Sequence, residues 1–281
     1  MIFHKNITTI AENYDYFILD IWGVLHDGTH VYDEVIEQLE YLRSLNKKIC
    51  LLSNAPRRAQ KVVNLLENLG IGRNLYDYIL TSGEATYSSL FDSNNSQNYY
   101  YIGPEKDVDL LHGLGCNLVP DAKDANFAIV TGFDDGNYDI STKIPQLKTA
   151  LENNLSLICS NPDLIVIKKS GEELLCAGII AEEYKKMGGK VTYFGKPHQL
   201  VYEQVFKLFS NADKSRILAV GDGLETDILG ANKNQIDSAL IGGGILANKL
   251  NIKHGELPDE YLLKKICDQY NAYPTFVIGS L

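Results

Sequence analysis

Apolar runs alternate with amphipathic segments along the first 80 residues. Three continuous apolar runs predict buried strands: 16–20, 48–53 and 76–80. Two intervening segments carry apolar residues at helical spacing: 35–42 and 59–69. Pro56 suits the first turn of the second helix, and Gly70 suits its end. Strands that alternate with helices in this way predict a parallel sheet with right-handed crossovers.

The same pattern returns in the last third of the chain. Strands are predicted at 216–222, 238–241 and 275–278, with a helix at 226–232. The middle of the chain has apolar runs of its own: 99–102, 127–131, 155–160 and 164–167. We therefore predict an α/β protein in which a second α/β domain (87–189) is inserted into a first domain formed by residues 1–86 and 190–281.

Composition narrows the partners that this chain is expected to bind. The net charge of −10 and the pI of about 5.1 disfavour nucleic acid, because an acidic surface repels a phosphate backbone. No apolar stretch reaches the roughly 18 residues that span a bilayer, so no membrane contact is expected. The start lacks the pattern of a secretory signal, and five scattered cysteines show no paired metal spacing. We expect a cytoplasmic location.

Polar residues follow the apolar runs at four places. They are Asp20, Ser53-Asn54, Gly195-Lys196, and Gly221-Asp222 with Asp227 close behind. In an open parallel sheet, the carboxyl ends of the strands form the ligand crevice. If these segments pair in one sheet, all four groups converge there.

The acids in this set suit phosphoryl transfer. Asp20 can attack phosphorus and form an acyl phosphate, which divides one difficult step into two easier ones. Asp222 and Asp227 are hard oxygen ligands, and together with Asp20 they could hold Mg²⁺. Each acid alone is more typical of a helix cap or a turn than of a catalytic site, so the prediction depends on their order and spacing.

The other polar groups suit a bound phosphate. The Ser53 hydroxyl and the main-chain N–H of Asn54 can donate hydrogen bonds to phosphoryl oxygens. Lys196 adds positive charge where negative charge collects. Taken alone, Ser53-Asn54 is a good helix start and Lys196-Pro197 is typical of a solvated turn, so these residues gain meaning only from the full set.

The four segments together resemble the motifs of the haloacid dehalogenase (HAD) superfamily of hydrolases. The matching stretches are Asp20-Ile-Trp-Gly-Val, Leu52-Ser-Asn, Gly195-Lys-Pro-His and Gly221-Asp-Gly-Leu-Glu-Thr-Asp227. The 143 positions between Ser53 and Lys196 resemble the branch with a large α/β cap, the NagD-like sugar-phosphate and nucleotide phosphatases. Ser160-Asn-Pro-Asp163 and Cys176-Ala-Gly-Ile-Ile180 are also similar to cap segments of that branch.

The resemblance implies a Rossmann-like core with an inserted cap, and a role for each matching residue. Asp20 would be the nucleophile, and Lys196 would assist it and bind phosphate together with Ser53, Asn54 and Gly23. Mg²⁺ would be held by the side chains of Asp20, Asp222 and Asp227 and by the main-chain carbonyl of Trp22. Asn161 and Asp163 are candidates for substrate contacts from the cap. The substrate would be a small phosphorylated metabolite, and the resemblance suggests a homodimer formed through the cap.

Trp22 departs from the family pattern. Phosphatases of this superfamily normally have an aspartate two residues after the nucleophile, which protonates the leaving group and then activates water. An indole cannot carry a proton between these steps. General acid–base help is worth about 10²–10⁴-fold in rate. His26 or Asp27 could supply the proton instead, or both could simply shape the loop before Gly28.

Three functions follow from this departure. The first is a Mg²⁺-dependent phosphatase with an aspartyl-phosphate intermediate and reduced or displaced acid catalysis. The second is a phosphate-ester-binding or regulatory protein without turnover. The third is another HAD chemistry, such as carbon–halogen cleavage, which needs no acid at position 22. Dehalogenation requires no magnesium site, so the presence of both Asp222 and Asp227 disfavours the third function.

Overall fold

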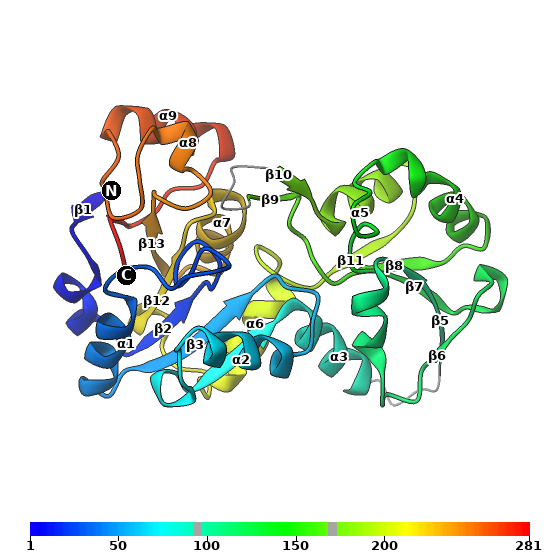
Figure 1. Ribbon diagram of the computed structural model, residues 1–281, viewed down its shortest axis with the longest axis horizontal. Helices are drawn as coiled ribbons and strands as arrows, with labels where there is room; N and C mark the ends of the chain where they lie inside the picture. Colours follow the sequence, from blue (N-terminus) through cyan, green and yellow to red (C-terminus); the bar gives the residue numbers. More distant parts are fainter. Residues whose placement is uncertain (93–96, 168–172) are drawn as a thin grey trace. The chain divides into compact units, whose positions relative to one another are not determined.

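The structure is a computed structural model that describes residues 1–92, 97–167 and 173–281 (Figure 1). The chain forms two compact units. The first consists of Met1–Ser53, Gln60–Leu80 and Lys196–Leu281, and the second consists of Asn54–Ala59 and Thr81–Gly195. The main stretch of the second unit begins at Thr81 and ends at Gly195, close to the predicted limits of the insert at 87 and 189, and the unit also includes residues 54–59. The exact limits of the insert stay a prediction.

The first unit is built on a seven-stranded sheet with the order β1-β14-β13-β12-β2-β3-β4. Its strands are β1 (Ile2–His4), β2 (Tyr16–Leu19), β3 (Lys48–Ser53), β4 (Tyr78–Thr81), β12 (Ile217–Gly221), β13 (Asp237–Ile241) and β14 (Phe276–Ile278). The pairings from β1 through to β3 are all parallel. The sheet therefore has the predicted Rossmann-like character.

Helices connect these strands. They are α1 (Val35–Ser44), α2 (Ala59–Asn68), α6 (Gln199–Leu208), α7 (Leu229–Asn234), α8 (Ala247–Leu250) and α9 (Glu260–Tyr270), with a π-helical turn, η8, at Leu224–Ile228. Short 3₁₀ turns occupy Ile7–Thr9, Ala11–Asn13, Arg73–Leu75 and Lys214–Arg216 in this unit. Within the described residues, no helix is both long enough and apolar enough to cross a membrane.

The central strands β12 and β2 are buried along almost their whole length, which explains their continuous apolar runs. All five residues of β12 are buried, and its neighbour β2 is buried from Phe17 to Leu19. A strand that is covered on both faces has no polar side and so shows no alternation. In the register, Val220 pairs with Leu19, and Leu19 pairs with Leu51. The residues that follow these three strands therefore emerge at the same edge of the sheet.

Several predicted boundaries in this unit are corrected by the structure. Strand β2 ends at Leu19, so Asp20 lies just beyond it, and Pro56 lies in the loop before α2 instead of in its first turn. The predicted helix at 226–232 is instead the π-helical turn η8 followed by α7. Strand β1 was not predicted, because a strand of three residues at the edge of a sheet shows too short a pattern.

The second unit has its own parallel sheet, with the order β11-β8-β7-β5-β6. Its elements are α3 (Ser82–Asp92), β5 (Asn98–Ile102), β6 (Asn117–Leu118), β7 (Phe127–Val130), α4 (Ile144–Glu152), β8 (Ser156–Cys159), β9 (Ile165–Ile167), β10 (Glu173–Leu175), α5 (Ala177–Lys186) and β11 (Val191–Tyr193). Its 3₁₀ segments are Glu105–Leu111, Ala122–Asp124 and Ile140–Thr142. The predicted strand at 164–167 does not join this sheet, because β9 pairs antiparallel with β10.

Apolar side chains of strands β7 and β8 and of helix α5 fill the core of the second unit. Residues of β7 and β8, including Val130 and Leu157, pack with Ile180 and Tyr184 of α5. The Tyr184 hydroxyl donates a hydrogen bond of 2.6 Å to the Leu155 carbonyl, which satisfies the polar end of a buried ring. The predicted fold class, a parallel α/β core with an inserted α/β unit, is confirmed.

Candidate active site

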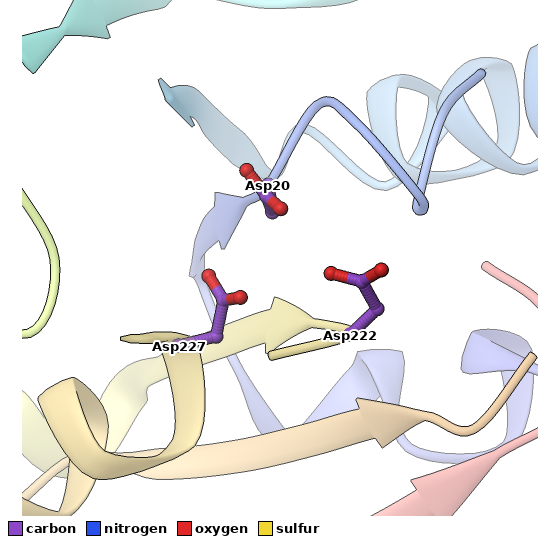
Figure 2. Close-up of side chains that lie close together, drawn as sticks. All are labelled: Asp20, Asp222 and Asp227. Carbon is purple, nitrogen blue, oxygen red and sulfur yellow. The ribbon is translucent and has the colours of Figure 1, made fainter. Parts of the chain in front are cut away.

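Three carboxylates meet where the central strands of the first unit end. Asp20 follows β2, Asp222 follows the adjacent strand β12, and Asp227 lies in η8. One oxygen from each side chain lies within 4.8 Å of the others. Figure 2 shows the three side chains directed toward a common space. The convergence follows from the parallel pairing of β2 with β12, which brings both strand ends to one edge.

Lys196 lies between two of these acids. Its Nζ is 2.6 Å from Oδ1 of Asp20 and 2.7 Å from Oδ1 of Asp227. The residue is only 3% exposed, so these contacts are formed away from bulk water. A buried ammonium group is tolerated only when it is paired and hydrogen bonded, and both conditions hold here. The structure thus brings Asp20, Lys196, Asp222 and Asp227 together.

Glycines make room for the acids. A Cβ atom built on Gly23 would lie 2.0 Å from Oδ2 of Asp222, and one on Gly244 would lie equally close. A Cβ atom on Gly221 would lie 2.0 Å from Cγ of Asp227. Gly23 also has φ +80°, a backbone conformation that favours glycine. Any larger residue at these positions would displace a carboxylate.

Main-chain donors fix the orientation of two of the acids. The N–H of Ile245 donates a 2.7 Å hydrogen bond to Oδ2 of Asp222. The N–H of Gly223 donates one of 3.1 Å to Oδ2 of Asp227, and the Thr226 hydroxyl lies 3.2 Å from the same oxygen. Gly244 and Ile245 were not among the predicted site residues. The signal for them was the run of three glycines that follows the predicted strand 238–241.

The charges in this cluster are unbalanced. Burial, together with the nearby charge of Asp227, raises the pKa of Asp20 to about 7 in spite of the opposing effect of Lys196. Burial, with Asp20 and Asp227 nearby, raises the pKa of Asp222 well above its ordinary value. Burial alone would lower the pKa of Lys196, but the two carboxylates outweigh it and raise that pKa. Three acids share one lysine, so a further cation would lower the energy of the ionised cluster.

These residues fit a divalent metal ion. All three side chains offer hard oxygen atoms within a span that one ion can bridge, and Mg²⁺ prefers a few carboxylates supplemented by water. The glycine cradle and the main-chain hydrogen bonds fix the positions of the acids before any ion binds. The metal role of the Trp22 carbonyl stays a prediction.

The predicted phosphate donors occupy two different units. Ser53 is the last residue of β3, next to β2 in the sheet of the first unit. Asn54 belongs to the second unit, where its buried side-chain amide donates a 2.7 Å hydrogen bond to Oδ1 of Asp163. Asn54 therefore uses its side chain within the protein, while the role of its main-chain N–H stays a prediction.

Asn161 and Asp163 form a turn in the second unit. The side-chain oxygen of Asn161 accepts a 3.2 Å hydrogen bond from the main-chain N–H of Asp163. A Cβ atom on Gly195 would lie 2.7 Å from the Asn54 side-chain oxygen and 2.6 Å from Pro162, so this loop packs tightly against the residue before Lys196. The predicted contact of Asn161 and Asp163 with substrate stays a prediction.

Trp22 is 41% exposed and its ring rests on the loop that follows it. A Cβ atom on Gly28 would lie 2.4 Å from Cη2 of the indole, so only glycine fits beneath the ring. The imidazole of His26 meets the indole edge to face, with centroids 5.6 Å apart at 72°. The loop between Trp22 and Gly28 is thus organised around the indole.

His26 and Asp27 are engaged in shaping this loop. Nδ1 of the buried His26 accepts a 2.8 Å hydrogen bond from the Gly28 N–H, and burial lowers the pKa of His26. Oδ1 of Asp27 accepts hydrogen bonds of 2.9 and 2.8 Å from the N–H groups of Thr29 and His30. These contacts favour the prediction that His26 and Asp27 shape the loop before Gly28 over the prediction that one of them supplies a proton.

Comparisons with known proteins agree with this geometry. Residues 17–117 match a family model described as haloacid dehalogenase-like hydrolase, and residues 193–268 match a second one described as HAD-hydrolase-like. The chain is similar to an acid sugar phosphatase of Staphylococcus saprophyticus, at 23% identity over 91% of this chain and 96% of that protein. It is also similar to the 5′-nucleotidase YutF of Bacillus subtilis, at 23% identity over 83% of this chain and 89% of that protein.

Solved structures give the same result. A haloacid dehalogenase-like hydrolase from Brucella suis 1330 is 30% identical, with a TM-score of 0.81, and the match covers 98% of each chain. A 4-nitrophenylphosphatase from Thermotoga maritima is 24% identical, with a TM-score of 0.74, covering 95% of this chain and 94% of that one. The likeness to the Thermotoga maritima protein shows that the two chains share a fold.

Proposed function

This chain belongs to the haloacid dehalogenase-like hydrolases, and from that premise we propose that it is a phosphatase of small phosphorylated metabolites. Two kinds of relative support the proposal, an acid sugar phosphatase and a 5′-nucleotidase, because both names describe the release of phosphate from a small ester. The conclusion about this chain, however, depends on its own site.

One observation carries the proposal: Lys196 lies 2.6 Å from Asp20 and 2.7 Å from Asp227, with Asp222 in the same cluster. A carboxylate at the end of a buried strand is a suitable nucleophile for phosphorus. The Lys196 ammonium holds the Asp20 carboxylate in one orientation and adds positive charge beside the position that an incoming phosphoryl group would take.

We assign the metal role to the carboxylates of Asp20, Asp222 and Asp227, with Mg²⁺ as the ion, and to the main-chain carbonyl of Trp22. When bound, Mg²⁺ would neutralise negative charge on the cluster and on the phosphoryl oxygens. Asp222 and Asp227 keep the orientations that Ile245 and Gly223 impose on them, so the three acids need little rearrangement.

Phosphate oxygens would be bound by Lys196, the Ser53 hydroxyl and the main-chain N–H of Asn54. The N–H of Gly23, also a predicted phosphate contact, instead donates a 3.0 Å hydrogen bond to the His26 carbonyl. The position of Ser53 at the end of β3, beside β2, supports its part in this set. Asp20 would attack the phosphorus and form an aspartyl phosphate, and water would then hydrolyse that intermediate. Asn161 and Asp163 are the proposed contacts to the remainder of the substrate.

A second function is favoured by Trp22. Because an indole cannot protonate a leaving group, the site could bind phosphate esters without turning them over. A binding protein of this kind would retain Lys196, Ser53 and the metal acids for recognition. It would show saturable binding of phosphate esters with no release of phosphate.

A screen of phosphorylated metabolites with Mg²⁺ or with EDTA decides between these functions. We expect phosphate release that requires Mg²⁺ and is lost in Asp20→Asn, because the amide cannot attack phosphorus. Asp135→Asn removes the same charge from an exposed side chain of the second unit and is the matched control. Phosphate release that survives in Asp20→Asn would exclude the proposed mechanism, and binding without release would favour the second function.

A further inference from the structure

Trp22 is exposed although its surroundings are tightly packed. It is the single tryptophan of the chain, and it stands two positions after Asp20. Its neighbours Ile21, Val24 and Leu25 are all buried, whereas the indole leaves 41% of its surface open. An exposed large aromatic side chain two residues after a reactive carboxylate is a surface available for stacking.

The exposed ring is held in place before any ligand arrives. Its benzo edge rests on Gly28, and His26 contacts it edge to face at 5.6 Å between centroids. The main chain closes the same loop, since the Gly23 N–H donates a 3.0 Å hydrogen bond to the His26 carbonyl. The indole therefore loses little conformational entropy when a ligand ring stacks on it.

The same loop offers no side chain suited to protonating a leaving oxygen. Trp22 has no transferable proton, and His26 is 1% exposed with Nδ1 accepting from the Gly28 N–H. Asp27 accepts main-chain hydrogen bonds from Thr29 and His30. Among the side chains of this loop, Trp22, His26 and Asp27 therefore offer no proton to a leaving oxygen beside the indole, and we infer that this oxygen departs as an anion.

Leaving-group chemistry then limits the substrate. A phenol releases its proton with a pKa of about 10, as tyrosine does. A simple alcohol holds its proton far more tightly than a phenol, much as water does, so its alkoxide leaves far less readily without an acid. Aryl oxides are thus the leaving groups that best tolerate Trp22, and they are also flat aromatic rings that can stack on an indole.

We propose, on the premise that the chain is a phosphatase, that Trp22 selects small aryl phosphates, in which the phosphate oxygen is bonded directly to an aromatic ring. An Asp20 carboxylate oxygen forms a bond to phosphorus while the bond from phosphorus to the aryl oxygen breaks. The aryl oxide departs with the electron pair, and solvent protonates it afterwards. Water then attacks the aspartyl phosphate, which releases inorganic phosphate, regenerates the Asp20 carboxylate and gives one proton to solvent.

Binding can be tested without turnover, because Trp22 is the only source of tryptophan fluorescence. Phenylphosphonate and propylphosphonate carry the same charged group and cannot be hydrolysed at an ester oxygen. In the presence of Mg²⁺, phenylphosphonate should shift the emission of Trp22 to shorter wavelength and bind about 3- to 10-fold more tightly, as expected for one aromatic pair. Equal affinity of the two phosphonates would overturn the proposal.

Kinetics supply the second arm. We compare phenyl phosphate with glycerol phosphate in the wild type, Trp22→Phe, Trp22→Leu and the control Tyr261→Leu, which removes an exposed ring from α9. The preference for phenyl phosphate in kcat/KM should fall about 3- to 10-fold in Trp22→Leu and be retained in Trp22→Phe and Tyr261→Leu. In the control Tyr261→Leu, the KM for both esters should equal that of the wild type.

The outcomes separate the two proposals. If wild type hydrolyses both esters and Trp22→Leu keeps the same preference, the aryl selectivity is wrong and the phosphatase function stands. If neither ester is hydrolysed and neither phosphonate binds, both proposals fail. If phenylphosphonate binds selectively and nothing is hydrolysed, Trp22 selects aromatic phosphates in a binding protein, and only the enzymatic premise is lost.

Discussion

Gly23 and Asp222 lie so close that a Cβ atom at position 23 would be 2.0 Å from Oδ2 of the aspartate. That oxygen also accepts the 2.7 Å hydrogen bond from the Ile245 N–H, so it cannot move without breaking a partly buried hydrogen bond. The absence of a side chain at position 23 therefore sets the position of a proposed metal ligand.

Gly23→Ala should weaken the response to Mg²⁺. The new methyl group would push the Asp222 carboxylate out of the cluster, and we expect the Mg²⁺ concentration for half-maximal activity to rise about 10-fold or more, as for a lost ligand orientation. Gly70→Ala is the control, because Gly70 also has positive φ but has no atom within 4 Å of its built Cβ. An equal loss of Mg²⁺ response in both variants would show that backbone strain alone is responsible.

Lys196→Met should destabilise the protein in a manner that Mg²⁺ partly reverses. Removing the ammonium leaves Asp20 and Asp227 buried without their cation, and breaking a buried pair typically costs about 3–5 kcal/mol. The free energy of unfolding in urea, with and without Mg²⁺, measures the effect. Lys143→Met removes another buried lysine, paired at 2.8 Å with Asp134 of the second unit. The decrease in unfolding free energy that this variant causes should not depend on Mg²⁺.

Trp22→Asp should increase turnover of alkyl phosphates. A carboxylic acid at this position could protonate an alkoxide leaving group, and general acid catalysis is worth about 10²–10⁴-fold. The measurement is kcat for glycerol phosphate in Trp22→Asp and in Trp22→Asn, which has nearly the same shape but no acidic proton. Equal rates in the two variants would indicate that a group outside the loop from Trp22 to Gly28 supplies the proton.

Asp163→Ala should raise the KM for phosphate esters more than it changes kcat. Asp163 holds the Asn54 amide at 2.7 Å, and the main-chain N–H of Asn54 is a proposed phosphate donor. Loss of this anchor should raise KM about 10-fold, in line with roughly 1–2 kcal/mol for one hydrogen bond to a charged group. Asp163→Asn retains a side-chain oxygen and should recover most of the affinity. A fall in kcat alone would contradict this role.

Asp77 should contribute stability that is lost in acid. Its carboxylate accepts a 2.9 Å hydrogen bond from the Ile49 N–H and lies 3.0 Å from Lys48 and 2.6 Å from Arg43. Burial raises the pKa of Asp77, but the Ile49 and Lys48 hydrogen bonds and the charge of Arg43 outweigh it, so the net pKa lies below the ordinary 3.8.

A depressed pKa in the folded state means that Asp77 stabilises the protein above pH 3.8 and loses this effect as pH falls through the folded value. The difference in unfolding free energy between wild type and Asp77→Asn should therefore be larger at pH 6 than at pH 2.5. Asp135→Asn, on an exposed pair, should cost at most about 1 kcal/mol at either pH. A difference for Asp77→Asn that is constant with pH would exclude the ionised carboxylate as the source.

The sequence predicted the arrangement of the central sheet because its strands are covered on both faces. The continuous apolar runs before Asp20 and Asp222 follow from that burial, and the parallel connection then brings both acids to one edge. The proximity of Lys196 could be expected from the motif order, although its distances to Asp20 and Asp227 required coordinates.

Other features depend on contacts between residues far apart in sequence. The hydrogen bond from Asn54 to Asp163 joins positions separated by about a hundred residues, and neither residue type predicts it. The strand predicted at 164–167 exists as β9, but its antiparallel partner β10 was not predicted, since a short apolar run does not reveal which strand it pairs with. The position of Gly244 against Asp222 likewise depends on how a loop returns to the sheet.

The order of strands in the first unit has a consequence for biosynthesis. Strand β2 lies between β3 and β12, and β12 is translated only after all of the second unit has been translated. The sheet of the second unit draws its strands from one uninterrupted stretch of chain, so it can close first. We therefore expect the second unit to fold first during synthesis. The seven-stranded sheet of the first unit can form completely only after the last third of the chain has been translated.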